Sequence, residues 1–106
     1  MTLSASPVVP GQRIVGSFGL VYGNTIRARH VGRDILAALK NVVGGEIEEY
    51  TKLMAEAREQ ALDRMAAQAR ARGANAVVNV RFSTSYIMGS ASEILAYGDA
   101  VVLERA

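Results

Sequence analysis

This sequence has no cysteine, no tryptophan and only one histidine among its 106 residues. The absence of cysteine excludes disulfide bonds, thiolate metal sites and cysteine nucleophiles. No apolar run approaches the roughly 18–20 residues that span a membrane. The opening MTLSASPVVPGQR has neither a basic region nor a long apolar run, so it does not resemble a signal peptide. We therefore expect a soluble, cytoplasmic protein with no membrane partner.

Charge is almost balanced, with 12 Lys or Arg against 10 Asp or Glu and a formal net charge of +2. This balance gives no electrostatic case for nucleic-acid binding. The length suits a single domain over residues 1–106. Residues 1–11 are expected to be an extended lead-in, because Pro7, Pro10 and Gly11 are incompatible with a helix.

Three segments have the pattern of β-strands. In residues 12–23 the apolar side chains recur with a period of two. In residues 76–87, Val78, Val80 and Phe82 alternate with polar residues, which predicts one apolar and one polar face. Residues 92–104 are apolar on both faces, so this strand is expected either at the centre of a sheet or under a partner.

Two segments have helical periodicity. A short helix is predicted over residues 32–43, ended by Gly44 and Gly45. A long helix is predicted over residues 46–72. The side chains expected on its buried face are Ile47, Tyr50, Met54, Ala57, Ala61 and Met65. Gly73 should end it. Such a helix would be roughly 40 Å long, so one end should project or pack on a neighbouring subunit.

The expected fold class is α+β. Its two layers are a three-stranded, mainly antiparallel sheet and one short and one long helix, in the order β-α-α-β-β. The strands of 76–87 and 92–104 are close enough in sequence to form a hairpin, and the helices should cover one face of the sheet. A sheet with one face uncovered needs a partner, so we expect a homo-oligomer.

The segments GRDILAALKNVVGG, YTKLMAEAREQAL, ARGANAVVNVRF and AYGDAVV, in this order and spacing, resemble the YbjQ-like family. The family is also called UPF0145 and is labelled heavy-metal-binding. The resemblance covers about residues 11–103. It implies a dodecin-like two-layer fold and a ring-shaped homo-oligomer, typically a pentamer. It implies no established activity and no ligand motif that can be carried over to particular residues.

The candidate metal ligands are His30, Glu46 and Glu49. One imidazole makes no soft-metal site by itself, although a ring could gather one His30 from each subunit. Glu46 and Glu49 share a helix face and could hold a hard divalent ion. The competing interpretation is that the glutamates stabilise the first turn of the long helix through its dipole, and that His30 lies in an exposed loop.

The candidate ligand-binding residues lie in three places. Arg33 and Asp34 are at the start of the short helix, where they either bind an anion or serve as cap residues. Tyr50 is placed where its hydroxyl could mark the edge of a cleft. The polar face of the 76–87 strand carries Asn79, Arg81, Ser83 and Ser85. That face either lines a ligand cleft, with Arg81 as an anion anchor, or is simply solvated.

These features favour a small oligomeric binding protein that holds a small ligand or ion at an inter-subunit cleft or at a ring axis. A metal-dependent enzyme that uses its acidic residues, with a divalent ion as cofactor, is the alternative, and a purely structural scaffold is a third. No serine nucleophile motif is present. The sequence therefore favours a binding protein over an enzyme, and it does not identify the ligand.

Overall fold

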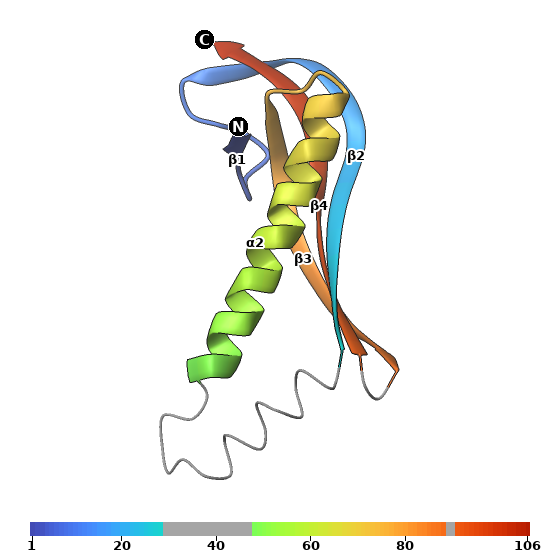
Figure 1. The fold of residues 1–106 in the computed structure, drawn as a ribbon. Helices are drawn as coiled ribbons and strands as arrows, with labels where there is room; N and C mark the ends of the chain where they lie inside the picture. The colour runs from blue at the N-terminus through green and yellow to red at the C-terminus, as the bar shows by residue number, and fades with distance from the viewer. Residues whose placement is uncertain (29–47, 89–90) are drawn as a thin grey trace.

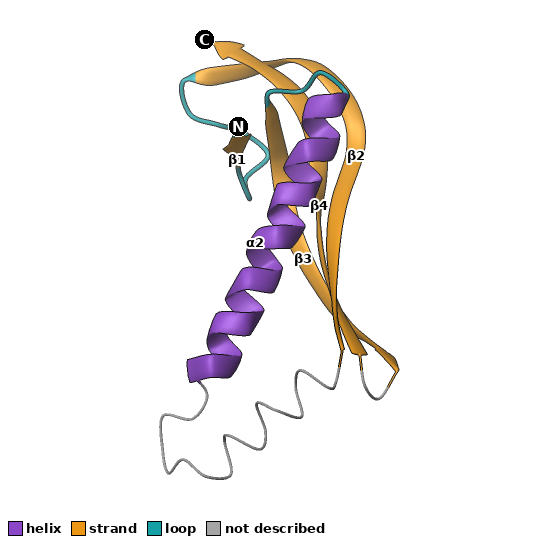
Figure 2. Cartoon of the chain, in the orientation of Figure 1, coloured by secondary structure: helices purple, strands orange, loops and turns teal. Residues whose placement is uncertain are grey.

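The computed structural model describes residues 1–28, 48–88 and 91–106. These residues form one four-stranded sheet and one helix packed on one of its faces (Figures 1 and 2). The elements are β1 (Thr2–Leu3), β2 (Gln12–Ala28), α2 (Glu48–Ala71), β3 (Ala76–Met88) and β4 (Ala91–Arg105). The strand order is β1-β3-β4-β2. No helix among the described residues is long and apolar enough to cross a membrane.

The α+β class agrees with the prediction, but the predicted three-stranded sheet with two helices is wrong. Residues 2–3 form a fourth strand, which pairs parallel to β3 and makes the sheet mixed. The element order over the described residues is therefore β-β-α-β-β, and the dodecin-like description of three strands does not hold. Residues 1–11 were expected to be an extended lead-in, and backbone groups of Ser4 and Ser6 in this lead-in form hydrogen bonds with β3. The short helix predicted over 32–43 lies outside the described residues.

Strand β4 occupies the centre of the sheet, between β3 and β2. Its two apolar faces enter two different clusters. Ile94, Ala96 and Ala100 are buried against α2. Val101 and Leu103 are buried on the opposite face, with Val9 packed against them. The expectation that this strand is central or covered is confirmed, because a central strand can bury side chains on both faces.

The long helix is present, and its predicted apolar face is the one that is buried. Ala57, Ala61 and Met65 are fully buried, and Ala69 continues the same face. Gly73, at φ +95, ends the helix. The amide of Gly73 donates to Arg70 O, and that of Ala74 to Ala69 O, the paired bonds of a Schellman C-cap. Figure 1 shows the N-terminal end of the described helix standing away from the strands. This agrees with the expectation that one end of the long helix projects from the sheet.

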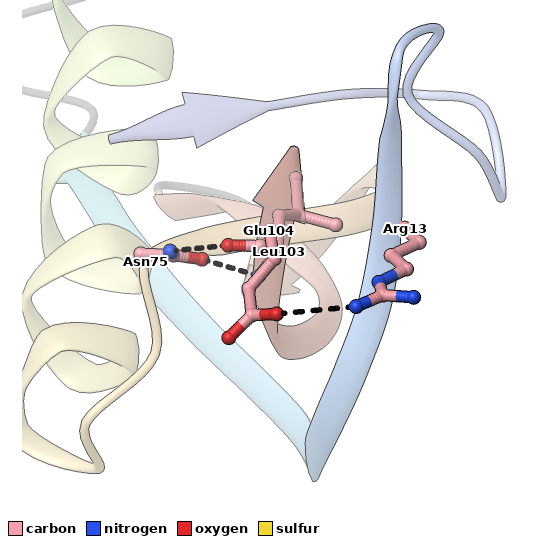
Figure 3. A network of polar contacts seen from close by, with 4 residues as sticks. All are labelled: Arg13, Asn75, Leu103 and Glu104. Carbon is pink, nitrogen blue, oxygen red and sulfur yellow. Dashed lines mark hydrogen bonds and ion pairs between the residues drawn. The ribbon is translucent and has the colours of Figure 1, made fainter. Parts of the chain in front are cut away.

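The loop between α2 and β3 is held to β4 by one side-chain amide. Asn75 donates from Nδ2 to Leu103 O at 3.0 Å and accepts from Leu103 N at 2.7 Å (Figure 3). The same figure shows Arg13 facing Glu104 across β2 and β4, at 3.6 Å. Both side chains of this ion pair are largely exposed, so its contribution to stability is small. The Asn75 bonds therefore do more to hold this end of the sheet in place.

Helix α2 approaches β2 most closely at Gly23. A Cβ atom on Gly23 would lie 2.3 Å from both Ala61 O and Met65 N, which are backbone atoms of the helix. No side chain larger than hydrogen fits there without moving the helix. The small residues of the helix face, Ala57 and Ala61, allow the same close packing from the other side. This contact sets the distance between the two layers.

Three polar side chains of α2 reach over the outer edge of β2. Arg72 donates to Leu20 O at 2.8 Å, Gln68 Oε1 accepts from Tyr22 N at 2.8 Å, and Arg64 donates to Asn24 O. Arg64, Gln68 and Arg72 are four residues apart, so they share one side of the helix. Residues 20, 22 and 24 of β2 direct their backbone groups away from β4, and in a bare edge strand these groups would be unpaired. The helix therefore caps the middle of this edge.

A β-bulge interrupts β3 between Val78 and Arg81. Asn79 there has φ +55, a left-handed conformation that asparagine tolerates better than most residues. The bulge reverses the alternation of faces, so Val77 and Val80 both pack against α2, whereas Val78 joins the opposite cluster. The prediction that Val78, Val80 and Phe82 share one face is therefore wrong. A period-two pattern does not reveal an extra residue in a strand.

We expect Gly23→Ala to destabilise the protein by about 1–3 kcal/mol, because the new methyl group would overlap backbone atoms of α2 that cannot move independently. The matched control is Gly16→Ala, also in β2, where a Cβ would lie 3.8 Å from the nearest atoms, both of Val102. Urea unfolding at equal protein concentration measures both. Equal stabilities for the two variants would contradict the close approach.

We expect Asn79→Ala to be less stable than Asn79→Gly by about 1 kcal/mol, because only glycine and a few polar residues adopt the left-handed conformation at low cost. Both variants lose the 3.1 Å hydrogen bond from Asn79 Nδ2 to Asp99 Oδ2, so the difference isolates the backbone effect. Thermal and urea unfolding provide the comparison. If alanine were tolerated as well as glycine, the left-handed bulge would be refuted.

Candidate functional site

The sheet face opposite α2 carries the polar residues that the sequence singled out. Residues directly opposite one another in neighbouring strands share a face. Ser83 lies opposite Leu95, and Ser85 opposite Glu93. The next residues of β4, Ile94 and Ala96, are buried against the helix. Ser83 and Ser85 therefore lie on the far side of the sheet, and both are exposed.

Strand β2 completes three rows across this face. The register places Tyr22 opposite Tyr97, Asn24 opposite Leu95, and Ile26 opposite Glu93. Together with the β3 register, this gives three rows that run from β2 through β4 to β3. They are Tyr22–Tyr97–Arg81, Asn24–Leu95–Ser83 and Ile26–Glu93–Ser85. We call this set of nine residues the open face. No described helix covers it, so its hydroxyl, amide and carboxylate groups are available to a ligand or to another subunit (Figure 2).

Two of the predicted ligand-binding residues are already used inside the chain. Arg81 donates to Ala5 O at 2.7 Å and to Val80 O at 2.9 Å. Asn79 donates to Asp99, and its backbone amide donates to Ser6 O. Both residues hold the lead-in against the bulge of β3. These bonds of Arg81 both come from Nη1 of its guanidinium, and its expected role as an anion anchor stays a prediction.

Glu93 is the acidic residue of the open face, and sequence analysis missed it. Its Oε2 accepts a hydrogen bond from Asn24 Nδ2 at 3.0 Å, which joins β4 to β2. Glu93 is half-buried, and its other carboxylate oxygen can accept further donors or a cation. The signal was weak because Glu93 lies near the start of the predicted strand of residues 92–104, where a polar residue is common. Only the sheet register brings it beside Ser85 and Asn24.

The remaining predicted site residues cannot be assembled from the described part of the chain. His30, Arg33, Asp34 and Glu46 lie outside the described residues. Glu49 and Tyr50 lie near the N-terminal end of the described helix α2, which stands away from the sheet (Figure 1). Residue 47 lies outside the described residues, so the dipole interpretation of the glutamates stays a prediction. These six candidates remain predictions.

The donor set does not fit a soft heavy-metal site within one chain. Thiolate and imidazole are the ligands that Zn²⁺, Cu⁺ and similar ions prefer, and the sequence offers no cysteine and one histidine. Of the four methionines, Met65 is fully buried and Met54 packs against the core. No group of three His, Cys, Asp or Glu residues that could hold a metal ion occurs among residues 1–28, 48–88 and 91–106. The described residues of one chain therefore offer no complete metal site.

An exposed apolar row along β2 is the largest feature that sequence analysis did not predict. Leu20 is 57% exposed, Ile26 53% and Tyr22 51%. Ile14, Val15 and Phe18 of the same strand are also exposed. The alternation of Ile14, Phe18, Leu20 and Tyr22 in the sequence predicts one apolar face. In β2 this alternation is interrupted by register shifts between Ile14 and Gly16 and between Ser17 and Gly19. From Leu20 onward the strand is regular: Val21, Gly23 and Thr25 are buried on the core face, and the row of Leu20, Tyr22 and Ile26 faces outward.

Two smaller features are a surface hollow near the N-terminus and a buried threonine hydroxyl. A shallow hollow of about 550 Å³ is lined by Met1, Thr2, Arg70, Ala74 and Asn75. The amide of Asn75 is already engaged with Leu103, so the hollow offers few free polar groups beyond Arg70. On the core face, Thr25 Oγ1 is buried and has no hydrogen-bond partner among the residues that the structure describes. Neither feature brings together the residues of a site.

Comparison with known proteins identifies the family. The family model YbjQ_1, described as "Putative heavy-metal-binding", matches residues 1–104. A UPF0145 protein of Dehalococcoides mccartyi is 55% identical over 98% of this chain and 100% of its own length. One from Pyrococcus horikoshii is 58% identical over 94% of this chain and 86% of its own. One from Archaeoglobus fulgidus is 55% identical, covering 95% and 94%.

A solved structure supports the fold alone. A protein of unknown function of the DUF74 family from Pediococcus pentosaceus matches with a TM-score of 0.64 and 11% identity, covering 98% of each chain. The identity is too low to transfer any site residue. The match of the family model to nearly the whole chain, together with full-length relatives above 50% identity, confirms the resemblance seen in the sequence. This chain belongs to the YbjQ-like, or UPF0145, family.

Proposed function

We propose that this protein is a homo-oligomeric binding protein whose subunits associate through the apolar row of β2 and the adjoining open face. A small polar ligand or a hard cation is held between the subunits. The observation that carries the proposal is the position of Leu20, Tyr22 and Ile26, large side chains more than half exposed on one strand. Contiguous exposed apolar surface of this kind usually marks an interaction site.

The shape of the chain supports association. Its Cα radius of gyration is 17.1 Å and its extents are 55 × 26 × 17 Å. A compact domain of this length has a radius of gyration of about 13 Å. An elongated two-layer molecule exposes more apolar surface than a compact one, so burial between copies would stabilise it. The ring of five subunits implied by the family resemblance is the arrangement that we propose.

The chemistry of the open face supports an oxygen-recognising site. Ser83, Ser85 and Glu93 lie beside one another on β3 and β4, next to the exposed apolar row. Hydroxyl and carboxylate oxygens bind hard cations such as Ca²⁺ and Mg²⁺, or hydrogen-bond to polar ligands. One carboxylate is insufficient for a cation, but several copies of Glu93 around an axis, or at an interface, would supply enough. The proposed site is therefore incomplete without the oligomer.

We expect Leu20→Lys to dissociate the oligomer, because it places a charge in the middle of the apolar row. The control is Ala67→Lys, which adds the same charge at an exposed position of α2. Native mass spectrometry and light scattering measure the number of subunits. Circular dichroism should show the fold retained, since surface changes usually cost within about 0.5 kcal/mol. A wild-type protein that is monomeric at high concentration would overturn the proposal.

We expect a hard divalent cation to stabilise the oligomer more than a soft one does. Ca²⁺ or Mg²⁺ should raise the Tm of the wild type by about 4–8 °C per kcal/mol of binding free energy. Glu93→Gln should remove this effect, since it deletes the charge and keeps an acceptor for Asn24. Glu104→Gln, at an exposed position on the same strand, is the control. A larger shift with Cd²⁺ than with Mg²⁺, retained in Glu93→Gln, would contradict an oxygen-donor site.

A further inference from the structure

The two long edges of the sheet differ in how they are protected. On β2, the backbone groups of Leu20, Tyr22 and Asn24 that point away from β4 are bonded by side chains of α2. Each of these bonds occupies a position that an added strand would need. Strand addition to the middle of β2 would therefore have to break them. The edge of β2 is therefore closed to strand pairing from Leu20 to Asn24, where the helix side chains bond it.

The opposite edge is covered only in part. Strand β1 pairs with β3 at Ala76 and Val77, and the lead-in continues the bonding as far as Val80, whose amide donates to Ser4 O. Arg81 then bonds the carbonyls of Ala5 and Val80. Beyond this point no described segment pairs with the outer side of β3. The lead-in and Arg81 thus define where the covered part of the edge ends.

The register shows which backbone groups of the uncovered part are free. Tyr22 and Asn24 point away from β4, so the β4 residues opposite them, Tyr97 and Leu95, pair with β3. Their β3 partners, Arg81 and Ser83, therefore point inward. The residues between and after them, Phe82, Thr84 and Tyr86, direct their amide and carbonyl groups outward. The side chains of residues 82–85 are exposed, so this edge is accessible.

The first part of the uncovered segment lacks the usual protection of an edge strand. Residues 82–86 read FSTSY and contain no charged residue, no proline and no glycine. Natural edge strands are commonly protected by lysine, proline or a bulge. Short uncharged segments with aromatic and β-branched residues pair readily with other strands. In this chain, Arg81 ends the protected part, and the next interruption of β3 is the register shift between Tyr86 and Met88.

We propose that residues 82–86 of β3 pair with the same segment of a second copy, antiparallel and about a two-fold axis near Thr84. The pairing extends the sheet from one copy into the next. A second copy fits because the segment is uncharged, so its self-approach brings no like charges together. It is also self-complementary, since antiparallel pairing about Thr84 sets the outward residue Phe82 opposite the outward residue Tyr86. A two-fold contact closes on itself and does not propagate into fibres.

This contact is separate from the one on β2. The proposed function places copies against the apolar row of β2 and the open face, whereas the β3 pairing uses backbone groups at the other edge. The two contacts together would double the number of subunits that the β2 contact alone gives. Their failures can be distinguished, because each is removed by a different substitution.

Amide hydrogen exchange of the wild type tests the pairing directly. We expect the outward amides of Phe82, Thr84 and Tyr86 to exchange as slowly as the inward amides of Ser83 and Ser85, slowed by roughly two orders of magnitude or more relative to an open chain. Outward amides that exchange freely while the inward ones are protected would overturn the inference. This measurement requires no variant and so does not depend on whether a variant folds.

Substitutions at the edge give the second test. Thr84→Pro removes an outward N–H without touching the bonds to β4, and proline is tolerated at such edge positions. We expect it, and Thr84→Lys, which sets like charges opposite each other at the axis, to halve the subunit number measured by native mass spectrometry, while Thr84→Val leaves it unchanged. An unchanged number in both Thr84→Pro and Thr84→Lys would refute the β3 pairing. A number lowered by these variants but not by Leu20→Lys would instead refute the β2 contact of the proposed function.

Discussion

The close approach of α2 to β2 at Gly23 is the contact on which the rest of the structure depends. Nothing larger than hydrogen fits between the strand and the helix backbone at this position. Glycine therefore allows the helix to lie directly against β2, at one edge of the sheet. From that position Arg64, Gln68 and Arg72 reach the outer backbone groups of β2 and cap them. The helix thus buries one face of the sheet and protects one edge with a single set of contacts.

The same position of the helix leaves other surfaces uncovered. Phe82 lies opposite the buried Ala96, on the face that α2 covers, yet it is exposed because the helix packs mainly on β2 and β4. The open face and the apolar row of β2 have no described cover at all. Apolar surface left in water is a cost that association would relieve. The position of α2 therefore explains why one face of the sheet is buried. It also explains why the open face and the apolar row, which we propose to be an interface, stay exposed.

The family description and the chemistry of this chain point in different directions. A heavy-metal site would use thiolates or several imidazoles, and the sequence has no cysteine and one histidine. The open face offers hydroxyl, amide and carboxylate groups. Arg81, the residue of that face with most apparent ligand-binding potential, instead holds the lead-in to β3. The open face itself supplies oxygen ligands, and in the function that we propose its single carboxylate makes subunit association a condition of cation binding.

Local patterns determined much of the fold. The sequence alone indicated the long helix with its buried alanines, the glycine that ends it, the central strand with two apolar faces and the α+β class, because these depend on periodicity and capping within one segment. The fourth strand, the bulge at Asn79, the outward apolar row of β2 and the pairing of Asn24 with Glu93 depend on contacts between residues far apart in the chain. Only the tertiary structure decided these, since register and edge position are properties of neighbouring strands and not of any one strand's sequence.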